Sequence, residues 1–179
     1  MIHTIGVIGA GQMGNGIAQV AACAGYDVVM IDIKDEYVEK GLGTIQFSLG
    51  KLVSKERMTQ ADADAALARI KTGTERSMCA DCDLVVEAVP EVLSLKQDIF
   101  TELDSICKPE TILASNTSSI SITTIAASTQ RPEKVIGMHF MNPVPIMKLV
   151  EIINGAQTSE ATNSAVVAVS YTHLTLPTT

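Results

Sequence analysis

Three glycines near the start of the chain have the spacing of a phosphate-binding turn. In "GAGQMG", Gly9, Gly11 and Gly14 form the pattern GxGxxG between the apolar run "TIGVI" and the alanine-rich stretch "NGIAQVAACAG". Gly9 permits a tight turn, Gly11 lets a pyrophosphate approach the backbone, and Gly14 lets a helix pack closely against a strand. We expect Gln12 and Met13, which lie between these glycines, to contact the same cofactor.

An acid follows at the distance that a dinucleotide site requires. Asp32 ends the second apolar run, "DVVMIDI", 21 residues after Gly11. Its carboxylate would accept hydrogen bonds from a ribose diol and repel a 2′-phosphate, which favours NAD over NADP, although Lys34 weakens that preference. GxGxxG alone is also compatible with a glycine turn of no special function. Strand, turn, helix, strand and acid in this order predict a dinucleotide-binding βαβ unit.

A histidine and a glutamate in the second half of the chain could transfer a proton. His139 lies in "GMHFMNP" and Glu151 in "KLVEII". A base that takes a proton from a secondary alcohol is helped by a carboxylate that orients the imidazole and stabilises its charged form. The connection between the two residues could return Glu151 alongside His139, and Ser118 and Asn142 would then hold the substrate oxygen. Taken alone, a histidine beside an apolar strand is more often a core residue.

Six apolar runs supply the strands that would carry these groups. Hydrophobicity on both faces is typical of strands covered on both sides, as in a parallel sheet. We therefore predict an α/β fold, a Rossmann-type doubly wound, mostly parallel sheet. The predicted strands are residues 4–8, 27–33, 83–89, 111–116, 135–140 and 148–153.

A long segment between the second and third of these runs has helical spacing. Residues 35–69 contain "EYVEKGLGTIQFSLGKLVSK" and "TQADADAALARI", and Thr59 with Asp62 is typical of a helix start. The sequence thus predicts a helical hairpin inserted after the second strand.

Charge and composition exclude several classes of protein. The net charge is −7 and lysines and arginines form no cluster, so no nucleic-acid partner is expected. No window of about 18 apolar residues and no signal peptide is present, which predicts no membrane segment and a cytoplasmic location. The CxxC of Cys79 and Cys82 has no second pair or histidine at metal spacing. We expect structural thiols there, with redox chemistry or a metal as less favoured alternatives, and no metal site.

Three segments together identify a family. "VIGAGQMGNGIAQVAA", "ASNTSSISI" and "VIGMHFMNPVPIMKLVEII" closely resemble the NAD-binding domain of the (S)-3-hydroxyacyl-CoA dehydrogenases, nearest to the bacterial 3-hydroxybutyryl-CoA dehydrogenases. The resemblance covers about residues 4–169. It implies NAD as cofactor, an acyl-CoA as substrate, and reversible oxidation of a 3-hydroxyacyl-CoA to the 3-oxoacyl-CoA.

The resemblance also implies roles for the central residues of the predicted site. His139 matches the family's catalytic base, paired with Glu151. Ser118 matches the residue that binds the substrate's 3-oxygen, and Asn142 lines the same pocket. Asn116 and Ser118 fall on the nicotinamide side of the cofactor.

Further roles fall on charged residues outside that centre. Glu91 and Lys96 match cofactor contacts of the family. Lys51 and Lys55 match contacts to the CoA portion of the substrate, and their four-residue spacing puts both on one helix face, which suits a phosphate-bearing ligand. The alternative for the two lysines is that they are solvated surface charges.

The end of the chain departs from the family. We expect an NAD-binding domain over residues 1–169 and an unrelated-looking, disordered tail over residues 170–179, "SYTHLTLPTT". The family's C-terminal helical domain, through which it forms homodimers, would then be absent. Two alternatives to a working dehydrogenase stay open: a catalytically inactive NAD-binding fragment, or a related dehydrogenase of other hydroxy acids.

Glu87 has no assigned partner. It lies inside the apolar run "VVEAVPE", whereas Glu91 follows Pro90 at the place where the strand has ended. A buried carboxylate is costly unless it is paired. We expect Glu87 to be buried against polar neighbours.

Overall fold

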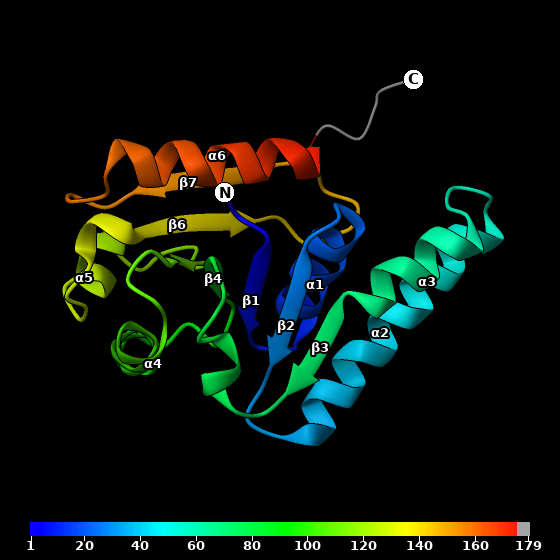
Figure 1. The fold of residues 1–179 in the computed structure, drawn as a ribbon, viewed down its shortest axis with the longest axis horizontal. Helices are drawn as coiled ribbons and strands as arrows, with labels where there is room; N and C mark the ends of the chain where they lie inside the picture. The colour runs from blue at the N-terminus through cyan, green and yellow to red at the C-terminus, as the bar shows by residue number, and fades with distance from the viewer. Residues whose placement is uncertain (175–179) are drawn as a thin grey trace.

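A single mixed sheet organises the molecule. The computed structural model describes residues 1–174, and within them the sheet has seven strands in the order β3-β2-β1-β4-β5-β6-β7 (Figure 1). Strands β1 to β6 are parallel, and β7 pairs antiparallel with β6. This confirms the predicted Rossmann-type α/β fold. The strands are β1 (Thr4–Ile8), β2 (Asp27–Ile31), β3 (Ile70–Gly73), β4 (Leu84–Glu87), β5 (Ile112–Ser115), β6 (Val135–Phe140) and β7 (Val150–Asn154).

The two edge strands differ from the prediction. Strand β3 was not among the predicted runs, because "IKTG" is short and half polar and gives no apolar signal. The expectation that strands are covered on both faces is wrong for β7. Its Glu151, Ile153 and Asn154 are exposed, as an antiparallel strand at the edge of a sheet allows.

Helices cover both faces of the sheet. One apolar cluster joins the sheet to α1, α2, α3 and α6, and a second joins it to α4 and α5 on the other face. Figure 1 shows α2 and α3 at the right of the view, and α4 and α5 at the left. The helices are α1 (Gln12–Cys23), α2 (Asp35–Ser54), α3 (Gln60–Ala68), α4 (Leu93–Ile106), α5 (Ile122–Ala126) and α6 (Glu160–Leu174), with 3-10 turns η1 (Arg76–Cys79) and η2 (Pro132–Lys134).

The chain reverses direction across the sheet next to β1. From β1 the chain builds β2 and β3 outward to one side, and it then returns to place β4, β5 and β6 on the other side. In such doubly wound sheets a crevice opens at the carboxyl ends of the strands where the order reverses, here between β1 and β4. Any site in this crevice is built from the segments that follow Ile8 and Glu87.

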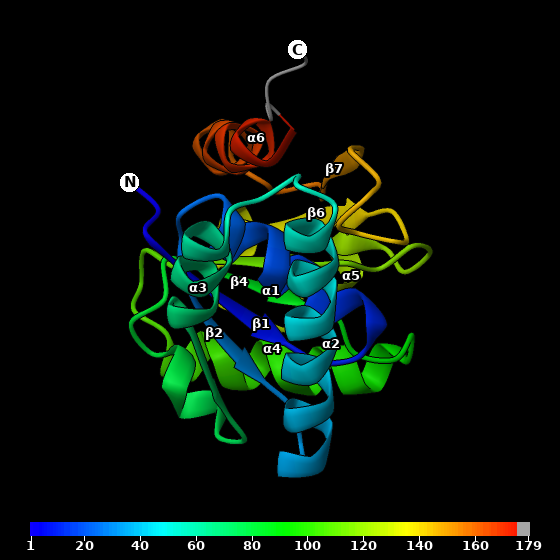
Figure 2. The same ribbon diagram turned by 90° about the vertical axis from the view of Figure 1, so that its right-hand side faces the viewer.

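Helices α2 and α3 form the predicted hairpin, and Figure 2 shows them side by side in front of the sheet. Thr59 caps α3 as predicted, because its hydroxyl accepts the backbone N–H of Asp62 at 3.1 Å. A Cβ added to Gly41 of α2 would lie 2.6 Å from the carbonyl oxygen of Ala10. The hairpin therefore packs directly on the glycine turn that follows β1.

Helix α6 extends into the predicted tail. It continues to Leu174, so the prediction of a disordered tail is wrong for residues 170–174. The helix continues there because Val166, Val169 and Ser170 are buried against the sheet and the Ser170 hydroxyl donates to the Val166 carbonyl at 2.9 Å. The rest of that predicted tail lies outside the described residues.

The CxxC thiols lie in the core. Cys79 and Cys82 are buried beside Gly6, where an added Cβ would lie 3.0 and 3.2 Å from the two sulfur atoms. A hydrogen bond with Cys82, followed by burial, raises the pKa of the Cys79 thiol. Burial raises the pKa of Cys107 to about 11. All four cysteines are free, and these three fill space in the core next to α4.

Candidate active site

The glycine turn has the shape that a pyrophosphate needs. Gly9 has a φ of +107°, and a Cβ on Gly14 would lie 1.8 Å from the Gly9 carbonyl oxygen. A Cβ on Gly11 would meet no atom within 4 Å, so this backbone faces open space. Helix α1 starts at Gln12 with no side-chain cap and no acid in its first turn. Its positive end is thus directed at the mouth of the turn, which favours an anion there.

Asp32 lies beside this turn at the carboxyl end of β2. One of its oxygens accepts the backbone N–H of Ala10 at 2.8 Å, and the other accepts that of Ile33 at 2.7 Å. Each carboxylate oxygen can accept a further hydrogen bond. The carboxylate is therefore held against the glycine turn and keeps acceptor capacity for a diol. These residues fit the ADP-ribose half of a dinucleotide.

His139 and Glu151 lie directly opposite each other on β6 and β7. Nδ1 of His139 is 2.9 Å from Oε2 of Glu151, with 22% of the histidine side chain and 52% of the glutamate side chain exposed. Because Nδ1 is engaged, Nε2 is the ring nitrogen left for a substrate.

Ser118 and Asn116 occupy the loop that follows β5. The amide oxygen of Asn116 accepts the backbone N–H of Phe140 at 2.8 Å, which ties this loop to the strand that carries His139. Ser118 donates its backbone N–H and its hydroxyl to one oxygen of Glu91, at 3.1 and 3.2 Å. The Thr117 hydroxyl donates to the other oxygen of Glu91 at 2.5 Å.

The surroundings of Glu91 favour its charged form. Burial opposes its charge, but the hydrogen bonds from Thr117 and Ser118 and the charge of Lys96 outweigh that effect and lower the pKa of Glu91. The role of Thr117 was missed in the sequence, although "SNTSS" contains it, because nothing local indicates that a threonine hydroxyl will meet an acid 26 residues away.

A cavity of about 310 Å³ brings seven of the predicted residues together. A second hollow of about 340 Å³ shares Ser118 and His139 with it and is also lined by Glu151. The two hollows meet at the histidine, so a ligand in either one can contact it. The predicted residues that line the first cavity are Met13, Glu91, Lys96, Asn116, Ser118, His139 and Asn142.

Two predicted residues lie elsewhere. Lys51 is in the last turn of α2 and Lys55 follows the end of that helix, both exposed, and the Lys55 backbone N–H donates to the Lys51 carbonyl at 3.1 Å. The ammonium of Lys51 lies 4.5 Å from the centre of the Phe47 ring. Neither lysine lines the cavities around His139.

The partner of Glu87 is Lys96. Glu87 is fully buried and forms an ion pair with the Lys96 ammonium, which is also buried. Its second oxygen accepts the Ser115 hydroxyl at 2.6 Å. The expectation of polar neighbours is therefore confirmed, and the partner is a residue that the sequence suggested only as a cofactor contact.

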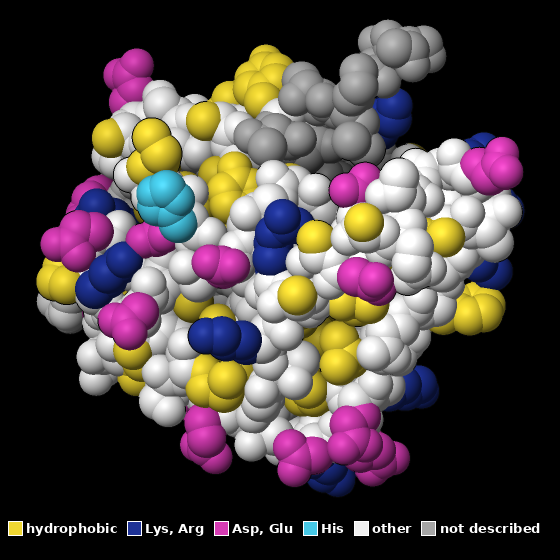
Figure 3. Space-filling model, turned by 45° about the vertical axis from the view of Figure 1, so that its right-hand side comes forward, with side chains coloured by type: hydrophobic (Ala, Val, Ile, Leu, Met, Phe, Trp, Pro, Cys, Tyr) yellow, Lys and Arg dark blue, Asp and Glu magenta, His cyan; other side chains and the backbone are white. Residues whose placement is uncertain are grey.

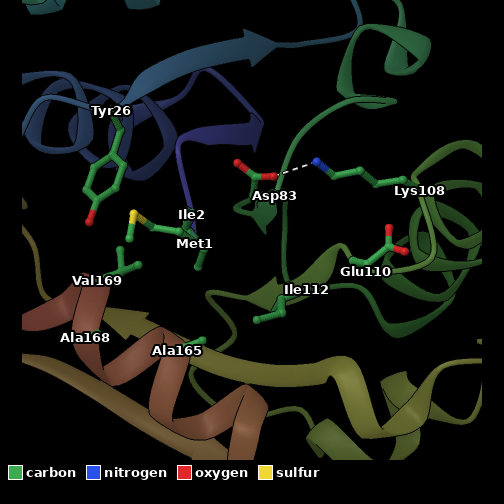
Figure 4. A pocket seen from close by; sticks show the side chains of 10 residues that line it. All are labelled: Met1, Ile2, Tyr26, Asp83, Lys108, Glu110, Ile112, Ala165, Ala168 and Val169. Atoms are coloured by element: carbon green, nitrogen blue, oxygen red, sulfur yellow. Dashed lines mark hydrogen bonds and ion pairs between the residues drawn. The ribbon is translucent and has the colours of Figure 1, made fainter.

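A larger cavity, about 450 Å³, lies at the opposite ends of the strands, where the strands begin (Figure 4). It is lined by residues at the amino ends of the strands, including Tyr26, Asp83 and Ile112, and by Ala165 and Val169 of α6. Figure 4 shows the ion pair between Asp83 and Lys108 across it. The lining is mostly apolar and contains none of the predicted site residues, so its size does not make it the candidate active site.

The surface carries charges of both signs side by side. On the face in Figure 3, basic side chains are interspersed with acidic and apolar ones rather than gathered in a band. Within residues 1–174, no three His, Cys, Asp or Glu side chains converge on a point where they could hold a metal ion. None of the described helices has the length and hydrophobicity needed to cross a membrane.

Comparison with known proteins decides the family. Residues 4–173 match the family described as "3-hydroxyacyl-CoA dehydrogenase, NAD binding domain". This chain belongs to that family. The cofactor of the family is NAD, which the glycine turn and Asp32 fit.

Relatives of this dehydrogenase domain agree with the assignment. A probable 3-hydroxybutyryl-CoA dehydrogenase of Deinococcus radiodurans is 57% identical over 88% of this chain and 56% of its own length. A 3-hydroxybutyryl-CoA dehydrogenase of Bradyrhizobium diazoefficiens is 52% identical over 92% of this chain and 56% of its own length. The chain thus spans about 56% of the length of these two relatives.

Solved structures show the same fold for this dehydrogenase domain. The crystal structure of (S)-3-hydroxybutyryl-CoA dehydrogenase from Ralstonia eutropha superposes with a TM-score of 0.95 and 51% identity, over 97% of this chain and 61% of that one.

Proposed function

We propose that this chain supplies the cofactor site and the proton-transferring pair of an NAD-dependent oxidoreductase that converts an (S)-3-hydroxyacyl-CoA, such as 3-hydroxybutyryl-CoA, to the 3-oxoacyl-CoA and back. The single observation that carries the proposal is the His139–Glu151 pair, held at 2.9 Å beside a cavity that also contains Ser118 and Asn142. The relatives named as 3-hydroxybutyryl-CoA dehydrogenases support the substrate class.

His139, Ser118 and Asn142 act on the oxygen atom at C3 of the substrate. Nε2 of His139 takes the proton of the 3-hydroxyl, and the carboxylate of Glu151 stabilises the imidazolium that results. Ser118 and Asn142 hold the oxygen in place so that the reacting carbon is oriented. NAD, when bound, supplies the hydride chemistry at that carbon. In the reverse direction His139 returns the proton to the oxygen.

The cofactor lies across the crevice in this proposal. Asp32 accepts hydrogen bonds from the ribose diol of the adenosine half, and the backbone at Gly11 lets the pyrophosphate pass toward the amino end of α1. Gln12 and Met13 belong to the first turn of that helix. The nicotinamide half then reaches the cavity beyond the end of β4, where Glu91, Lys96, Asn116 and Ser118 lie, and where it meets His139.

We extend the proposal to the two lysines of the hairpin, to the cellular location and to the oligomeric state. Lys51 and Lys55 contact phosphate groups of the CoA, with solvated surface charge as the alternative. A cytoplasmic location is supported by free thiols at all four cysteines, since reducing compartments keep cysteines unpaired. We also propose a homodimer for the whole enzyme, as expected from the family resemblance.

The second candidate function is a domain that binds NAD without turnover. It is favoured by the fact that the chain spans only 56% of the length of its relatives, so that part of an active site could be supplied by residues outside this match.

A titration with NADH and NADPH, combined with an acetoacetyl-CoA reduction assay, distinguishes the candidates. The proposed enzyme binds NADH more tightly than NADPH and oxidises NADH only when acetoacetyl-CoA is present. NADH binding without any acetoacetyl-CoA-dependent oxidation selects the binding domain. Absence of NADH binding contradicts both candidates, and tighter binding of NADPH contradicts the role of Asp32.

A further inference from the structure

We propose that Glu87 is a positioning residue for the nicotinamide half of the cofactor, acting as the buried counter-ion that holds Lys96 and, through Lys96 and Ser115, the cavity wall formed by Glu91 and Ser118. This inference rests on the proposed NAD-dependent function. Glu87 itself does not line the cavity.

Glu87 joins three segments at the end of β4. One carboxylate oxygen forms the ion pair with Lys96 of α4 and accepts the backbone N–H of Val89 at 3.2 Å. The other oxygen accepts the Ser115 hydroxyl of β5 at 2.6 Å, and that hydroxyl oxygen in turn accepts the backbone N–H of Thr117 at 3.2 Å. One buried carboxylate thus connects β4, α4 and the loop that follows β5.

Lys96 carries the connection to the cavity. Its side chain is 2% exposed, and its ammonium donates to the Val89 carbonyl at 3.2 Å and lies 3.5 Å from an oxygen of Glu91. The Glu91 side chain is 39% exposed and holds the loop through Thr117 and Ser118. The order of contacts is therefore Glu87, Lys96, Glu91 and Ser118, from the core outward.

Stability alone gives little reason for this arrangement. Replacing a buried ion pair by apolar residues of similar volume is often neutral or stabilising, because the desolvation of two charges offsets their attraction. The other residues of β4 are Leu84, Val85 and Val86, which shows that this part of the core accepts apolar side chains. The Glu87–Lys96 pair stands at the strand end that borders the proposed cofactor crevice.

Removal of the Glu87 charge would redistribute these contacts. Among the described residues, Lys96 forms ion pairs with Glu87 and Glu91. In a Glu87→Gln variant the ammonium has Glu91 as its remaining carboxylate, and we expect Glu91 to turn toward it and away from Thr117 and Ser118. The loop that carries Asn116 and Ser118 then loses its anchor.

The movement of Glu91 and of the loop that carries Ser118 affects one half of the cofactor. The ADP part is placed by the glycine turn and Asp32, on the other side of β1 from Lys96. The nicotinamide half, nicotinamide with its ribose, occupies the cavity that Glu91 and Ser118 line. ADP, which lacks both that ribose and nicotinamide, does not reach this wall. The two ligands therefore separate a local effect at the wall from a general loss of structure.

The experiment measures dissociation constants for NADH and ADP by calorimetry, and the free energy of unfolding in urea, for the 179-residue chain and its variants. For Glu87→Gln we expect NADH to bind about tenfold more weakly, the effect of losing one charge-assisted contact, with ADP unchanged within about twofold. The control is Asp104→Asn, which breaks the largely buried ion pair with Arg131, away from the cavity. It should lower the free energy of unfolding and leave both affinities unchanged.

A double variant separates positioning from a purely structural role. Glu87→Gln combined with Lys96→Met removes both charges, so we expect the free energy of unfolding to recover relative to Glu87→Gln alone. NADH affinity should stay low, because the ammonium that Glu87 positions at the cavity wall is absent from the double variant. Recovery of NADH affinity together with stability would show that the pair is only structural.

Two other outcomes overturn the inference. Unchanged NADH affinity in Glu87→Gln rejects it and leaves the proposed function standing, and equal weakening of NADH and ADP rejects it as well. A wild-type chain that binds neither ligand overturns the proposed function and this inference with it. If Glu87→Gln does not fold, Ser115→Ala takes its place, since it removes one hydrogen bond to Glu87 and no charge. The same NADH-specific loss is then expected at about threefold.

Discussion

His139 and Glu151 face each other across the β6 and β7 pair, with Nδ1 of the imidazole 2.9 Å from a carboxylate oxygen. Because they are opposed residues of an antiparallel pair, their side chains lie on the same face of the sheet. The carboxylate orients the ring and leaves Nε2 for the substrate. This arrangement allows the imidazole to take a proton and the glutamate to stabilise the charge that forms.

Replacement of His139 by glutamine should abolish proton transfer without affecting the cofactor. Glutamine has no titratable nitrogen, and general acid–base catalysis contributes about 10² to 10⁴ in rate. We expect acetoacetyl-CoA reduction to fall by about that factor while the dissociation constant for NADH stays within about twofold. Loss of turnover and NADH binding together would contradict the role assigned to His139.

Glu151→Gln tests whether the pair acts as one unit. The single variant should lower turnover by about 10² because the imidazolium loses its counter-charge. A double variant with His139→Gln should be no slower than His139→Gln alone, since residues that act as a unit are not additive. Kinetics of all three variants would provide the check, and additive losses would show that the two residues act separately.

The glycine turn offers a matched pair of alanine substitutions. Gly14→Ala places a Cβ 1.8 Å from the Gly9 carbonyl, so the backbone must shift and the free energy of unfolding should fall by about 3 kcal/mol. Gly11→Ala meets no atom within 4 Å and should be stable, but its methyl group stands where the pyrophosphate approaches. Urea unfolding measures the stability of both variants, and titration with NADH measures their affinity for the cofactor. A Gly11→Ala variant with unchanged NADH affinity would reject the proposed course of the cofactor.

Asp32→Asn should narrow the preference for NADH over NADPH. The amide keeps the shape of the side chain but loses the charge that repels a 2′-phosphate, while NADH loses acceptor strength at its diol. The ammonium of Lys34 lies 5.5 Å from the centre of the Tyr37 ring, and after the substitution it can help to accept the added phosphate. We expect NADH to bind about tenfold more weakly, with NADPH weakened less or strengthened. Asp27→Asn, at the exposed other end of β2, is the control and should change neither affinity.

Asp83 should make stability depend on pH in the acid range. Burial opposes its charge, but the hydrogen bond from Lys108 and the backbone N–H groups of Thr4 and His3 outweigh this and lower the pKa of Asp83 to about 2. A lowered pKa in the folded state gives a stabilisation that is complete above the unfolded pKa, about 4, and is lost as the pH falls toward 2.

Asp83→Asn measures this contribution. The variant should be less stable than wild type in urea at pH 7, and the difference should persist down to about pH 4 and shrink below it. Asp83 borders the cavity at the amino ends of the strands, so NADH affinity should be unchanged. A stability difference that does not vary with pH would contradict the assignment of its cause.

The sequence alone predicted the elements whose signals are local. The glycine turn, the acid at the end of β2, the hairpin with its Thr59 cap and six of the seven described strands all follow from residue types within short segments. It missed β3 because that edge strand is half polar, and it misjudged β7 because an exposed edge strand can carry as many apolar residues as a buried one.

Tertiary structure decided which side chains meet. The Glu87 carboxylate is paired with Lys96, and Glu91 accepts the hydroxyl of Ser118 from a loop 27 residues away. Those contacts depend on strand order, register and the direction of each side chain, which neighbouring residues in the chain do not specify. The sequence therefore determined which reactive groups the site contains. Only the fold decided that the buried Glu87 pairs with Lys96, which lines the site.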